Sequence, residues 1–553
     1  MPTARVVLLR PPVEVLHKFS KPVENLAIGY LAAALRRAGH EAFMLDGMLF
    51  DWSEQETARR ALAENPDIVA CTTVLQYFPK RLRNLFLALR EGGFDGPILI
   101  GGHSASFMAT PILENVPEID AVVSGEGEHS IVAIADAHMQ RADWRGVPGV
   151  SSRSDAGIRS VPPQRIRDLD SVANPARDLT PEVIQRDGLV AVSTSRGCYA
   201  RCSFCSVPRF YGLERGAGLA AGNWLARSAA GAAAEIAELH EHFGVLEVLI
   251  VDDEFFGGST AGKLRARRFA GELIQRQLPT RFTISCRAEN VDVTVMSELK
   301  EAGLAHVFVG LEAGGQSDLR LYGKGHTVKQ NLDAVHIIKS LGLSFQPGFM
   351  LFNYRSSLDD LRRGLTFLRD IGELKPVTVN SAMDPHFGAP ITTDVRRKGL
   401  LIDDGLAMKG RFADPRVALL KKVASRCAAA FIPFMNTLAA VRSAITWEWR
   451  RTVPWRSAAE EALLDELEVQ VNQGLCAPVL WALDELEAHP TSAELPTEEL
   501  LDRVGRTLEA ETERLRLKQA MVLLHLEQRE GQVRYVTQSE LIGAQAGGAP
   551  AHA

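Results

Sequence analysis

The sequence lacks a strong charge of either sign, and it lacks a long apolar run. Lysine and arginine number 62 against 68 for aspartate and glutamate in 553 residues. No positive field therefore exists to attract nucleic acid or an anionic membrane surface. No segment approaches the roughly 20 apolar residues that span a bilayer, and MPTARVVLLRPPVEV at the N-terminus is typical of a first strand, not of a signal peptide. We expect a cytoplasmic protein that binds neither nucleic acid nor membrane.

The sequence also lacks the paired cysteines of a secreted disulfide scaffold. Cys198, Cys202 and Cys205 have the spacing C-x3-C-x2-C in SRGCYARCSFCSVPRFYG. Three thiolates on so short a loop can hold three irons of a 4Fe-4S cluster and leave the fourth iron open. Structural zinc is the alternative, but closed zinc sites take four ligands, and no second C-x2-C or histidine pair is present. The remaining cysteines are scattered in apolar surroundings: Cys71, Cys286, Cys427 and Cys476.

Residues 1–145 alternate short apolar runs with amphipathic segments. The runs VVLL, EAFML, DIVACT, PILIG and DAVVSG predict five strands. Five βα units fit a doubly wound, flavodoxin-like sheet, which binds ligands at the carboxyl ends of its strands. Gly101 and Gly102 follow the fourth strand, and Gly125 and Glu126 follow the fifth. Glycine there would let a ligand approach the backbone closely, although tight turns explain the same residues.

The rest of the chain divides by pattern into four parts. Residues 146–185 are rich in proline and charge without periodicity, which is typical of a linker. Over 186–395 the runs LVAVSTS, VLEVLIV, RFTISC, HVFVGLE, LSFQPGFMLF and VTVNSAM predict six parallel strands of a partial (β/α)6 barrel, with the cysteine loop at the chemical end of the first. Residues 396–540 predict a helical domain, and 541–553 are of low complexity and predicted to be disordered.

With Phe204 before the third cysteine, the loop resembles the radical S-adenosylmethionine (SAM) superfamily signature, C-x3-C-x-aromatic-C. The resemblance continues in GKGHTVKQNLDAVHIIKSLGL and HFGAPI. It implies that SAM chelates the open iron and that an electron from the cluster cleaves a carbon–sulfur bond of SAM. The resulting 5′-deoxyadenosyl radical would abstract hydrogen from a substrate. An electron donor such as flavodoxin or ferredoxin is implied as a partner.

The same resemblance implies SAM-binding side chains at the strand ends. Asp252, Asp253 and Glu254 follow the second barrel strand, where the family contacts the methionine amino group, although the usual Gly-Gly-Glu is absent. Arg287 follows the third strand, where a guanidinium would pair with the SAM carboxylate. Glu312 closes the fourth strand. The alternative for each of them is a surface acid or a structural salt bridge.

The front domain resembles the cobalamin-binding class of radical SAM enzymes in NLAIGYLAAALRRAGHEAFMLDG, GGHSASF and VVSGEGEHS. The resemblance covers about residues 5–390. It implies that the loop around Pro11 to Glu24 and the segment from Thr72 and Thr73 to Tyr77 face the corrin. The residues implied to flank the nucleotide tail are Gly101, Gly102, Gly125 and Glu126.

The histidine motif that many cobalamin proteins use below cobalt, Asp-x-His-x-x-Gly, is missing. DPHFG at 384–388 has one residue too few and is expected to lie far from the corrin domain, and DAH at 136–138 lacks the glycine. His17 is the histidine that could still approach the lower face, with a solvated loop histidine as the alternative. A cobalt without a strong lower ligand suits methyl transfer.

These features predict a cobalamin-dependent radical SAM methyltransferase. It would move a methyl group from SAM, through methylcobalamin, to a carbon of a small-molecule or natural-product intermediate. The same cofactors could instead serve ring formation, rearrangement or non-radical methylation, and a front domain that only scaffolds would leave radical SAM chemistry without cobalamin. A SAM- or cobalamin-sensing regulatory protein is the alternative of another class. A sensor needs no open iron, and no DNA-binding motif or basic patch is present.

Overall fold

The computed structural model describes residues 2–12, 21–73, 78–215, 223–449, 458–489 and 497–529. Contacts divide the chain into two compact units. The first comprises the described residues up to Ile371 together with Ala382–Ala413, and the second comprises Gly372–Ser381 and the described residues from Asp414 onward. His17, Tyr77 and the tail predicted at 541–553 lie outside the described residues.

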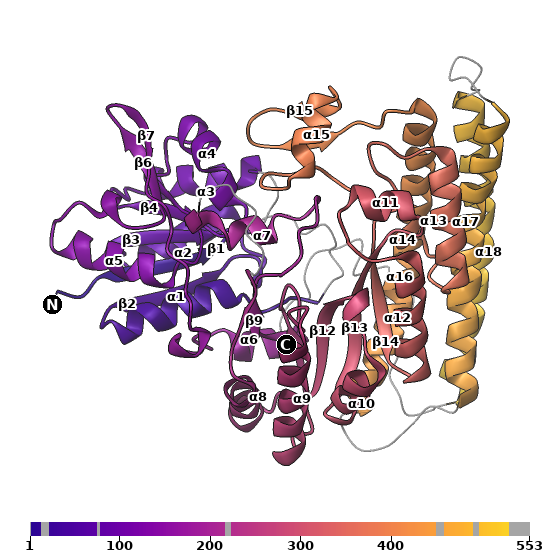
Figure 1. Cartoon of the computed structure of the whole chain (residues 1–553), viewed down its shortest axis with the longest axis horizontal. Helices are drawn as coiled ribbons and strands as arrows, with labels where there is room; N and C mark the ends of the chain where they lie inside the picture. The colour runs from indigo at the N-terminus through magenta and orange to yellow at the C-terminus, as the bar shows by residue number, and fades with distance from the viewer. Residues whose placement is uncertain are drawn as a thin grey trace. The chain divides into compact units, whose positions relative to one another are not determined.

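The front of the first unit is a sheet with strand order β2-β1-β3-β4-β5-β6-β7, at the indigo and violet end of the chain in Figure 1. The first five strands are parallel, in the order of a flavodoxin-like sheet, as the sequence predicts. Their bounds are β1 (Arg5–Arg10), β2 (Glu41–Asp46), β3 (Ile68–Thr72), β4 (Ile98–Gly101) and β5 (Ala121–Val123).

Two further strands, β6 (Val150–Ser154) and β7 (Gly157–Ser160), extend this sheet in antiparallel fashion. The sequence predicts a linker at 146–185 and no strands there. Their sequences, VSSRS and GIRS, hold few apolar residues, and most of β7 is exposed. An edge hairpin of this kind lacks the alternation by which a half-buried strand is recognised.

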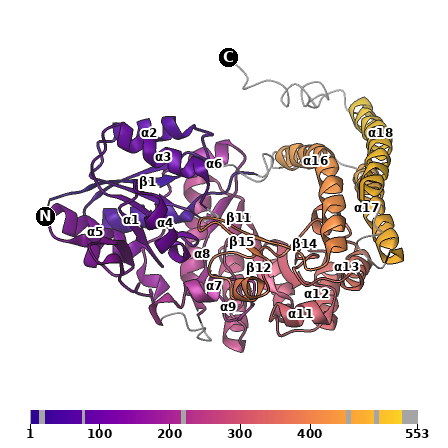
Figure 2. The same cartoon turned by 90° about the horizontal axis from the view of Figure 1, so that it is seen from above.

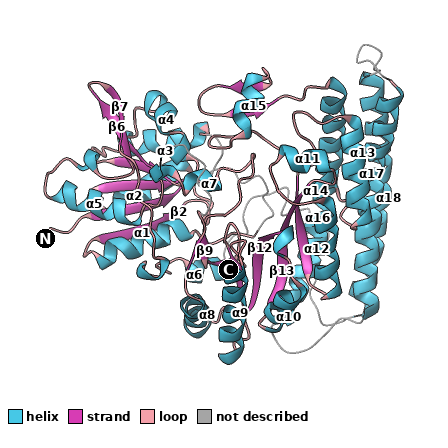
Figure 3. Cartoon of the chain, in the orientation of Figure 1, coloured by secondary structure: helices cyan, strands magenta, loops and turns pink. Residues whose placement is uncertain are grey.

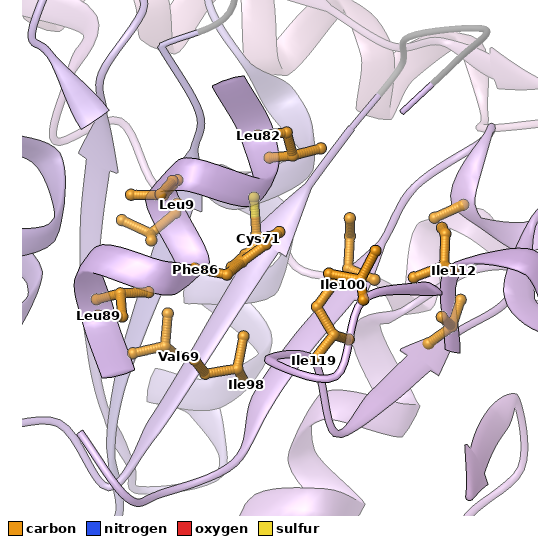
Figure 4. Close-up of a cluster of buried hydrophobic side chains, with 14 of the residues drawn as sticks. Leu9, Val69, Cys71, Leu82, Phe86, Leu89, Ile98, Ile100, Ile112 and Ile119 are labelled. Atoms are coloured by element: carbon orange, nitrogen blue, oxygen red, sulfur yellow. The ribbon is translucent and has the colours of Figure 1, made fainter. Parts of the chain in front are cut away.

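Helices cover both faces of the front sheet. Figure 2 shows α1 and α5 on one side and α2 and α3 on the other. On α3, Leu82, Phe86 and Leu89 recur at helical spacing and pack onto Val69 and Ile98 (Figure 4). The helices are α1 (Leu26–Arg37), α2 (Glu54–Ala63), α3 (Lys80–Glu91), α4 (Ala109–Asn115) and α5 (Glu128–Met139).

The barrel part of the first unit has a parallel sheet of five strands in the order β14-β13-β12-β11-β8. Five of the six predicted strands are therefore confirmed. The sixth, expected in VTVNSAM, is wrong as a strand: Pro376–Val379 form the short helix α14, and an isolated bridge joins Phe352 to Ala382. Proline at the first helical position favours that turn of helix. The strands are β8 (Val190–Val192), β11 (Glu247–Ile250), β12 (Arg281–Arg287), β13 (Leu304–Glu312) and β14 (Ser344–Phe349).

Helices alternate with these strands as the βα rhythm predicts. They are α6 (Thr180–Gln185), α7 (Val207–Phe210), α8 (Ala229–Phe243), α9 (Thr260–Gln275), α10 (Val293–Glu301), α11 (Gln316–Leu321), α12 (Val328–Ser340), α13 (Leu358–Asp370) and α15 (Ile391–Arg397). Two small hairpins complete the unit: β9 (Ser195–Arg196) with β10 (Leu225–Ala226), and β15 (Leu401–Asp403) with β16 (Met408–Gly410).

The second unit is helical, as predicted. Its long helices pack side by side in sequence order (Figure 3), and Val504, Leu508 and Leu515 are buried on one face of the last. None of the described helices is both long enough and apolar enough to cross a membrane. The helices are α16 (Pro415–Trp449), α17 (Ala458–Ala488) and α18 (Thr497–Arg529).

A buried ionic network joins the front part of the first unit to its barrel. Glu24 precedes α1, and Glu235 lies on α8. Arg177 donates from one nitrogen to Glu24 and from another to Glu235, at 2.5 Å in each case. Arg227 pairs with the second oxygen of Glu235. The two carboxylates and two guanidinium groups balance in charge, which makes their burial tolerable.

Replacing Arg177 by alanine should destabilise the first unit, because it leaves two buried carboxylates short of a partner. We expect the free energy of unfolding to fall by about 3–5 kcal/mol, measured by denaturant unfolding followed by tryptophan fluorescence. Arg267→Ala is the matched control, since Arg267 pairs with Glu298 at the surface and such pairs contribute about 1 kcal/mol or less. Equal losses in the two variants would contradict the assignment of the buried network.

Candidate active site

The cysteine loop lies between β9 and α7, at the carboxyl end of the barrel's first strand. Cys202 is buried, and Cys198 and Cys205 are half-buried. Ser203, inside the loop, anchors it: its backbone N–H donates to the Tyr322 carbonyl at 2.8 Å, and its own carbonyl accepts from Ile391 N–H at 2.7 Å. The three thiols are thus held on a loop that is fixed to two later segments of the barrel.

Asp252 is buried directly beneath the start of this loop. One of its oxygens accepts from the backbone N–H groups of Thr194 and Ser195, at 2.7 and 2.9 Å. The other accepts from the hydroxyls of the same two residues, at 2.5 and 2.7 Å. With four donors on its two oxygens, Asp252 fixes the turn that leads into the cysteine loop. Its predicted contact with SAM stays a prediction that these bonds do not favour.

The two acids that follow Asp252 differ from each other. Glu254 is fully buried and accepts from Asn290 at 2.8 Å and from the Gly257 N–H, so it also serves the local structure. Asp253 lines an internal cavity and accepts from the Gly197 N–H at 3.1 Å. Desolvation raises the pKa of Asp253 to about 6. Among the three acids, Asp253 is the one that faces open space.

Arg287 ends β12 with its guanidinium at the cysteine loop. Its Nη1 lies 3.0 Å from the Cys202 sulfur. Glu312 ends β13 in the left-handed region, with φ of 65°, where the pairing with β14 shifts register. It accepts from the buried Lys324 at 3.1 Å. Phe204 packs edge-on against Tyr322, with ring centroids 5.5 Å apart, so the aromatic residue of the motif serves the packing of the loop.

The cysteine loop fits an iron–sulfur cluster in its donor chemistry. Arg287 presents an N–H to the Cys202 sulfur, and the Ala200 nitrogen lies 3.5 Å from the Cys198 sulfur. Hydrogen bonds of this kind to the sulfurs are usual at iron–sulfur clusters. Burial raises the pKa of the Cys198 thiol to about 12; binding of iron would replace that proton. No three His, Cys, Asp or Glu side chains within the described ranges are grouped to hold a single metal ion.

A cavity of about 390 Å³ lies where the front sheet meets the first barrel strand. This volume lies within the usual range of small-molecule sites. Its walls combine apolar side chains of α1 and α5 with the strand ends of both sheets. It brings together six residues that the sequence singles out: Thr72, Gly101, Gly102, Gly125, Glu126 and Asp253. Thr73 is not among its lining residues; it is buried behind it, with its N–H donating to the Gly101 carbonyl at 3.0 Å.

Gly102 is needed for the backbone of this wall. Its φ is 101°, and an added Cβ would lie 2.4 Å from the Thr73 carbonyl oxygen. Such a contact with backbone cannot be relieved by moving a side chain. The close turn after β4 therefore depends on glycine, so the turn explanation and the cavity explanation both apply at this position.

Glu126 connects the cavity wall to the barrel. It accepts from Arg196 at 2.8 Å, and Arg196 also pairs with Glu128 at 2.7 Å. The second carboxylate oxygen of Glu126 accepts from the Ile166 N–H at 2.9 Å. Because Arg196 stands two residues before Cys198, this pair ties the glycine loop of the front sheet to the entry of the cysteine loop.

His103 is a site residue that the sequence analysis missed, although it stands in the quoted GGHSASF. It lines the cavity, its Nε2 lies 2.7 Å from the Ser206 hydroxyl, and its ring stacks on Phe210 at 4.7 Å. Ser206 follows the third cysteine directly. A histidine in a glycine-rich loop at a strand end was the available signal.

The expectation that DPHFG at 384–388 lies far from the corrin domain is wrong. An added Cβ on Gly388 would meet the Phe107 ring of the front domain at 2.7 Å, and the charge of His386 acts on His103. The turn follows β14 in sequence, but the chain returns there to the cysteine loop, where the Ile391 N–H donates to the Ser203 carbonyl. Sequence distance alone could not show that return.

Comparisons with known proteins agree with this arrangement. Residues 13–135 match the B12 binding domain, and residues 192–355 match the Radical SAM superfamily. The chain therefore carries a B12 binding domain followed by a Radical SAM domain.

Among relatives, an uncharacterized methyltransferase of Pyrococcus horikoshii is 29% identical over 359 residues, which are 64% of this chain and 74% of that protein. The 4′-phospho-dehydrooxetanocin synthase of Priestia megaterium is 25% identical over 389 residues, 66% of this chain and 51% of the synthase. The hopanoid C-3 methylase of Methylococcus capsulatus is 27% identical over 348 residues, 62% and 63% of the two chains. The chain thus spans between half and three quarters of these relatives.

Two solved structures share the fold. The cobalamin-dependent S-adenosylmethionine radical enzyme OxsB, with aqua-cobalamin and S-adenosylmethionine bound, matches with a TM-score of 0.74 at 19% identity, over 98% of this chain and 83% of that chain. The radical S-adenosylmethionine methyltransferase TsrM from Kitasatospora setae matches with a TM-score of 0.58 at 21% identity, over 72% and 78%.

The environment of His103 predicts a pH dependence of stability. Desolvation, helped by His386, lowers its pKa from 6.5 to about 4. The unfolded chain therefore binds a proton between these values that the folded chain does not. The folded state should lose stability as pH falls below 6.5, on the order of 2 kcal/mol by pH 5 in cofactor-free protein.

Denaturant unfolding of wild type and His103→Gln at pH 7 and pH 5 measures this loss. The variant should show a smaller loss on acidification than wild type. His129→Gln, on the exposed side of α5, is the matched control and should keep the wild-type dependence. A His103→Gln protein with the wild-type pH dependence would refute the assignment.

Proposed function

We propose that this protein is a cobalamin-dependent radical SAM methyltransferase acting on a carbon of a small-molecule or natural-product intermediate. The cavity carries the proposal, because it is bounded on one side by the glycine loops of the B12-binding domain and on the other by the entry to the cysteine loop. The names of the relatives support methyl transfer: two of those described above are methyltransferases or methylases.

The residues of the chain have separable tasks in this proposal. Cys198, Cys202 and Cys205 would hold the cluster, with SAM at its open iron, and Arg287 and Asp253 would be the charged groups that meet SAM. Thr72 would face the corrin of cobalamin, and Gly101, Gly102, Gly125 and Glu126 would flank its nucleotide tail. When bound, the cluster and SAM supply radical initiation, and cobalamin supplies a methyl carrier.

The protein's own contribution is position and exclusion of water. Tyr211 and Phe210 cover the barrel side of the cavity, and Tyr30 covers the front side. Arg196 lies 4.8 Å from the centroid of the Tyr30 ring and pairs with two carboxylates, which leaves its charge compensated. Reactive groups held in such a pocket are brought into alignment and are partly shielded from solvent.

Related outcomes with the same cofactors are the second candidate. The relative from Priestia megaterium is a synthase and not a methylase by name, so ring formation or rearrangement remains the competing outcome. The proposal also includes a cytoplasmic location. It includes an electron donor such as flavodoxin or ferredoxin, because the cluster must receive electrons one at a time.

Replacing Cys202 by alanine should abolish the cluster, because it removes the buried thiolate at the centre of the loop. After anaerobic reconstitution we expect loss of the cluster's visible absorbance, and loss of turnover by at least a hundredfold. Cys286→Ala is the matched control: Cys286 is also buried, but it lies within β12 outside the loop, and the variant should keep the cluster. A Cys202→Ala protein with full cluster absorbance would defeat the assignment of the loop.

The outcome of the reaction is tested with SAM carrying a deuterated methyl group, given to reconstituted protein with a candidate substrate under reducing, anaerobic conditions. Methyl transfer predicts deoxyadenosine, S-adenosylhomocysteine and a product that carries the label, all measured by mass spectrometry. Deoxyadenosine with an unlabelled, rearranged product would reject methyl transfer in favour of the second candidate. Failure of the reconstituted protein to retain any corrinoid would reject both.

A further inference from the structure

Arg287 uses most of its donors within the protein. Nε donates to Glu289 at 2.5 Å, Nη2 donates to the Lys324 carbonyl, and Nη1 lies 3.0 Å from the Cys202 sulfur. The side chain is 8% exposed. A guanidinium bound on three sides has one orientation, so the N–H that faces the sulfur is held there by its other partners.

Glu289 is the residue that connects this guanidinium to the cysteine loop a second time. Besides Arg287, it accepts from the Tyr199 hydroxyl at 3.0 Å. Tyr199 is the residue after Cys198, and its ring lies 5.6 Å from the guanidinium carbon of Arg287. One carboxylate thus holds the groups beside two of the three cysteines.

His326 completes the arrangement from the loop before α12. Its Nδ1 lies 2.8 Å from the second oxygen of Glu289, and its side chain is 1% exposed. Its Nε2 is buried and has no hydrogen-bond partner within the described ranges. Burying a ring nitrogen without a partner is unusual and calls for an explanation. Within the described ranges, the hydrogen bond that the His326 ring does make is the one to Glu289.

The charge state of Glu289 agrees with this geometry. Burial opposes its ionisation, but hydrogen bonds from His326 and Arg287 and the charge of Arg287 outweigh burial and lower the pKa of Glu289 to about 2. The carboxylate is therefore ionised at neutral pH, and each of its oxygens has a donor. A positioning role for Glu289 needs this fixed charge.

We propose that Glu289 and His326 are positioning residues that hold the Arg287 guanidinium against the Cys202 sulfur and thereby raise the reduction potential of the cluster. The inference rests on the proposed function, because it requires a cluster on the three cysteines. A donor and a positive charge at a cluster sulfur stabilise the more negative, reduced state. Glu289 and His326 therefore make reduction of the cluster by the electron donor easier.

Two roles of Glu289 predict opposite shifts. If its charge acted on the cluster directly, Glu289→Gln would remove a negative charge and raise the potential. If it acts by holding Arg287, the same change frees the guanidinium and lowers the potential. Glu289→Asp keeps the charge but cannot reach Arg287, Tyr199 and His326 together. A direct charge effect leaves the potential of that variant unchanged, whereas the positioning role lowers it.

The experiment is a dithionite titration of the reconstituted full-length protein, followed by electron paramagnetic resonance of the reduced cluster. We expect both Glu289 variants to shift the one-electron equilibrium about tenfold toward the oxidised cluster, which corresponds to about 59 mV. His326→Phe should shift it in the same direction. Glu298→Gln, which removes a surface carboxylate on α10, is the matched control and should leave the potential unchanged.

A double-variant cycle separates positioning from general damage. Arg287→Lys keeps the charge and loses the planar contacts, and it should lower the potential by itself. Adding Glu289→Asp to it should cause no further shift, because Glu289 acts through Arg287. Additive shifts would overturn the inference.

Iron and sulfide content are measured for every variant, so that the titration reports on clusters of equal occupancy. Glu289 variants with full cluster content and an unchanged or raised potential would overturn the inference and leave the proposed function standing. A wild-type protein that assembles no cluster would overturn the proposed function and this inference together.

Discussion

The active region depends on one buried carboxylate that is satisfied by four donors. Asp252, just after β11, accepts hydrogen bonds from the backbone N–H and hydroxyl groups of Thr194 and Ser195. Burial raises its pKa, and these bonds oppose the rise. A buried carboxylate without such partners would be very costly, so the turn after β8 has little freedom to take another form. The positions of Arg196 and the cysteine loop, which follow that turn, therefore depend on Asp252 and on β11 before it.

The second constraint is that the same short segment serves both halves of the first unit. Arg196 pairs with Glu126 and Glu128 of the front domain, and the hydroxyl of Ser206, beyond the third cysteine, meets His103. The cysteine loop is thus tied to the B12-binding domain at its beginning and at its end. Polar contacts of this kind fix direction more than they add stability, since buried ion pairs roughly repay their own desolvation. These contacts hold the two walls of the cavity between the domains in place.

The sequence predicted what depends on local pattern. The βα rhythm gave the five parallel strands of the front sheet and five of the barrel, and the cysteine spacing gave the loop. The pattern failed where structure depends on distant partners or on few apolar residues: β6 and β7 are polar, and Pro376, which favours a helical turn, directly precedes the predicted sixth strand. Asp252 and Asp253 are adjacent and chemically alike, yet one is enclosed by hydroxyls and the other faces the cavity. What separates them is which groups of the segment 194–197 each carboxylate meets: Thr194 and Ser195 for Asp252, and the Gly197 N–H for Asp253. That segment is distant in sequence from both.

The charged groups near the cysteines follow two neighbouring strands of the barrel sheet, β11 and β12. Of the groups after β11, Asp252 bonds to the turn that leads into the cysteine loop, whereas the Glu254 carboxylate accepts from Asn290 and from the Gly257 N–H. Arg287, at the end of β12, contacts the Cys202 sulfur; Glu289 accepts from Arg287 and bonds to His326. The turn that Asp252 fixes positions the entry of the cysteine loop, whereas Arg287 and Glu289 supply the charge beside it. The two sets are linked, because Asn290 donates to Glu254 and to the Tyr199 hydroxyl, which in turn donates to Glu289. In this fold, the residues that supply the charge beside the cysteines therefore also help to hold the loop.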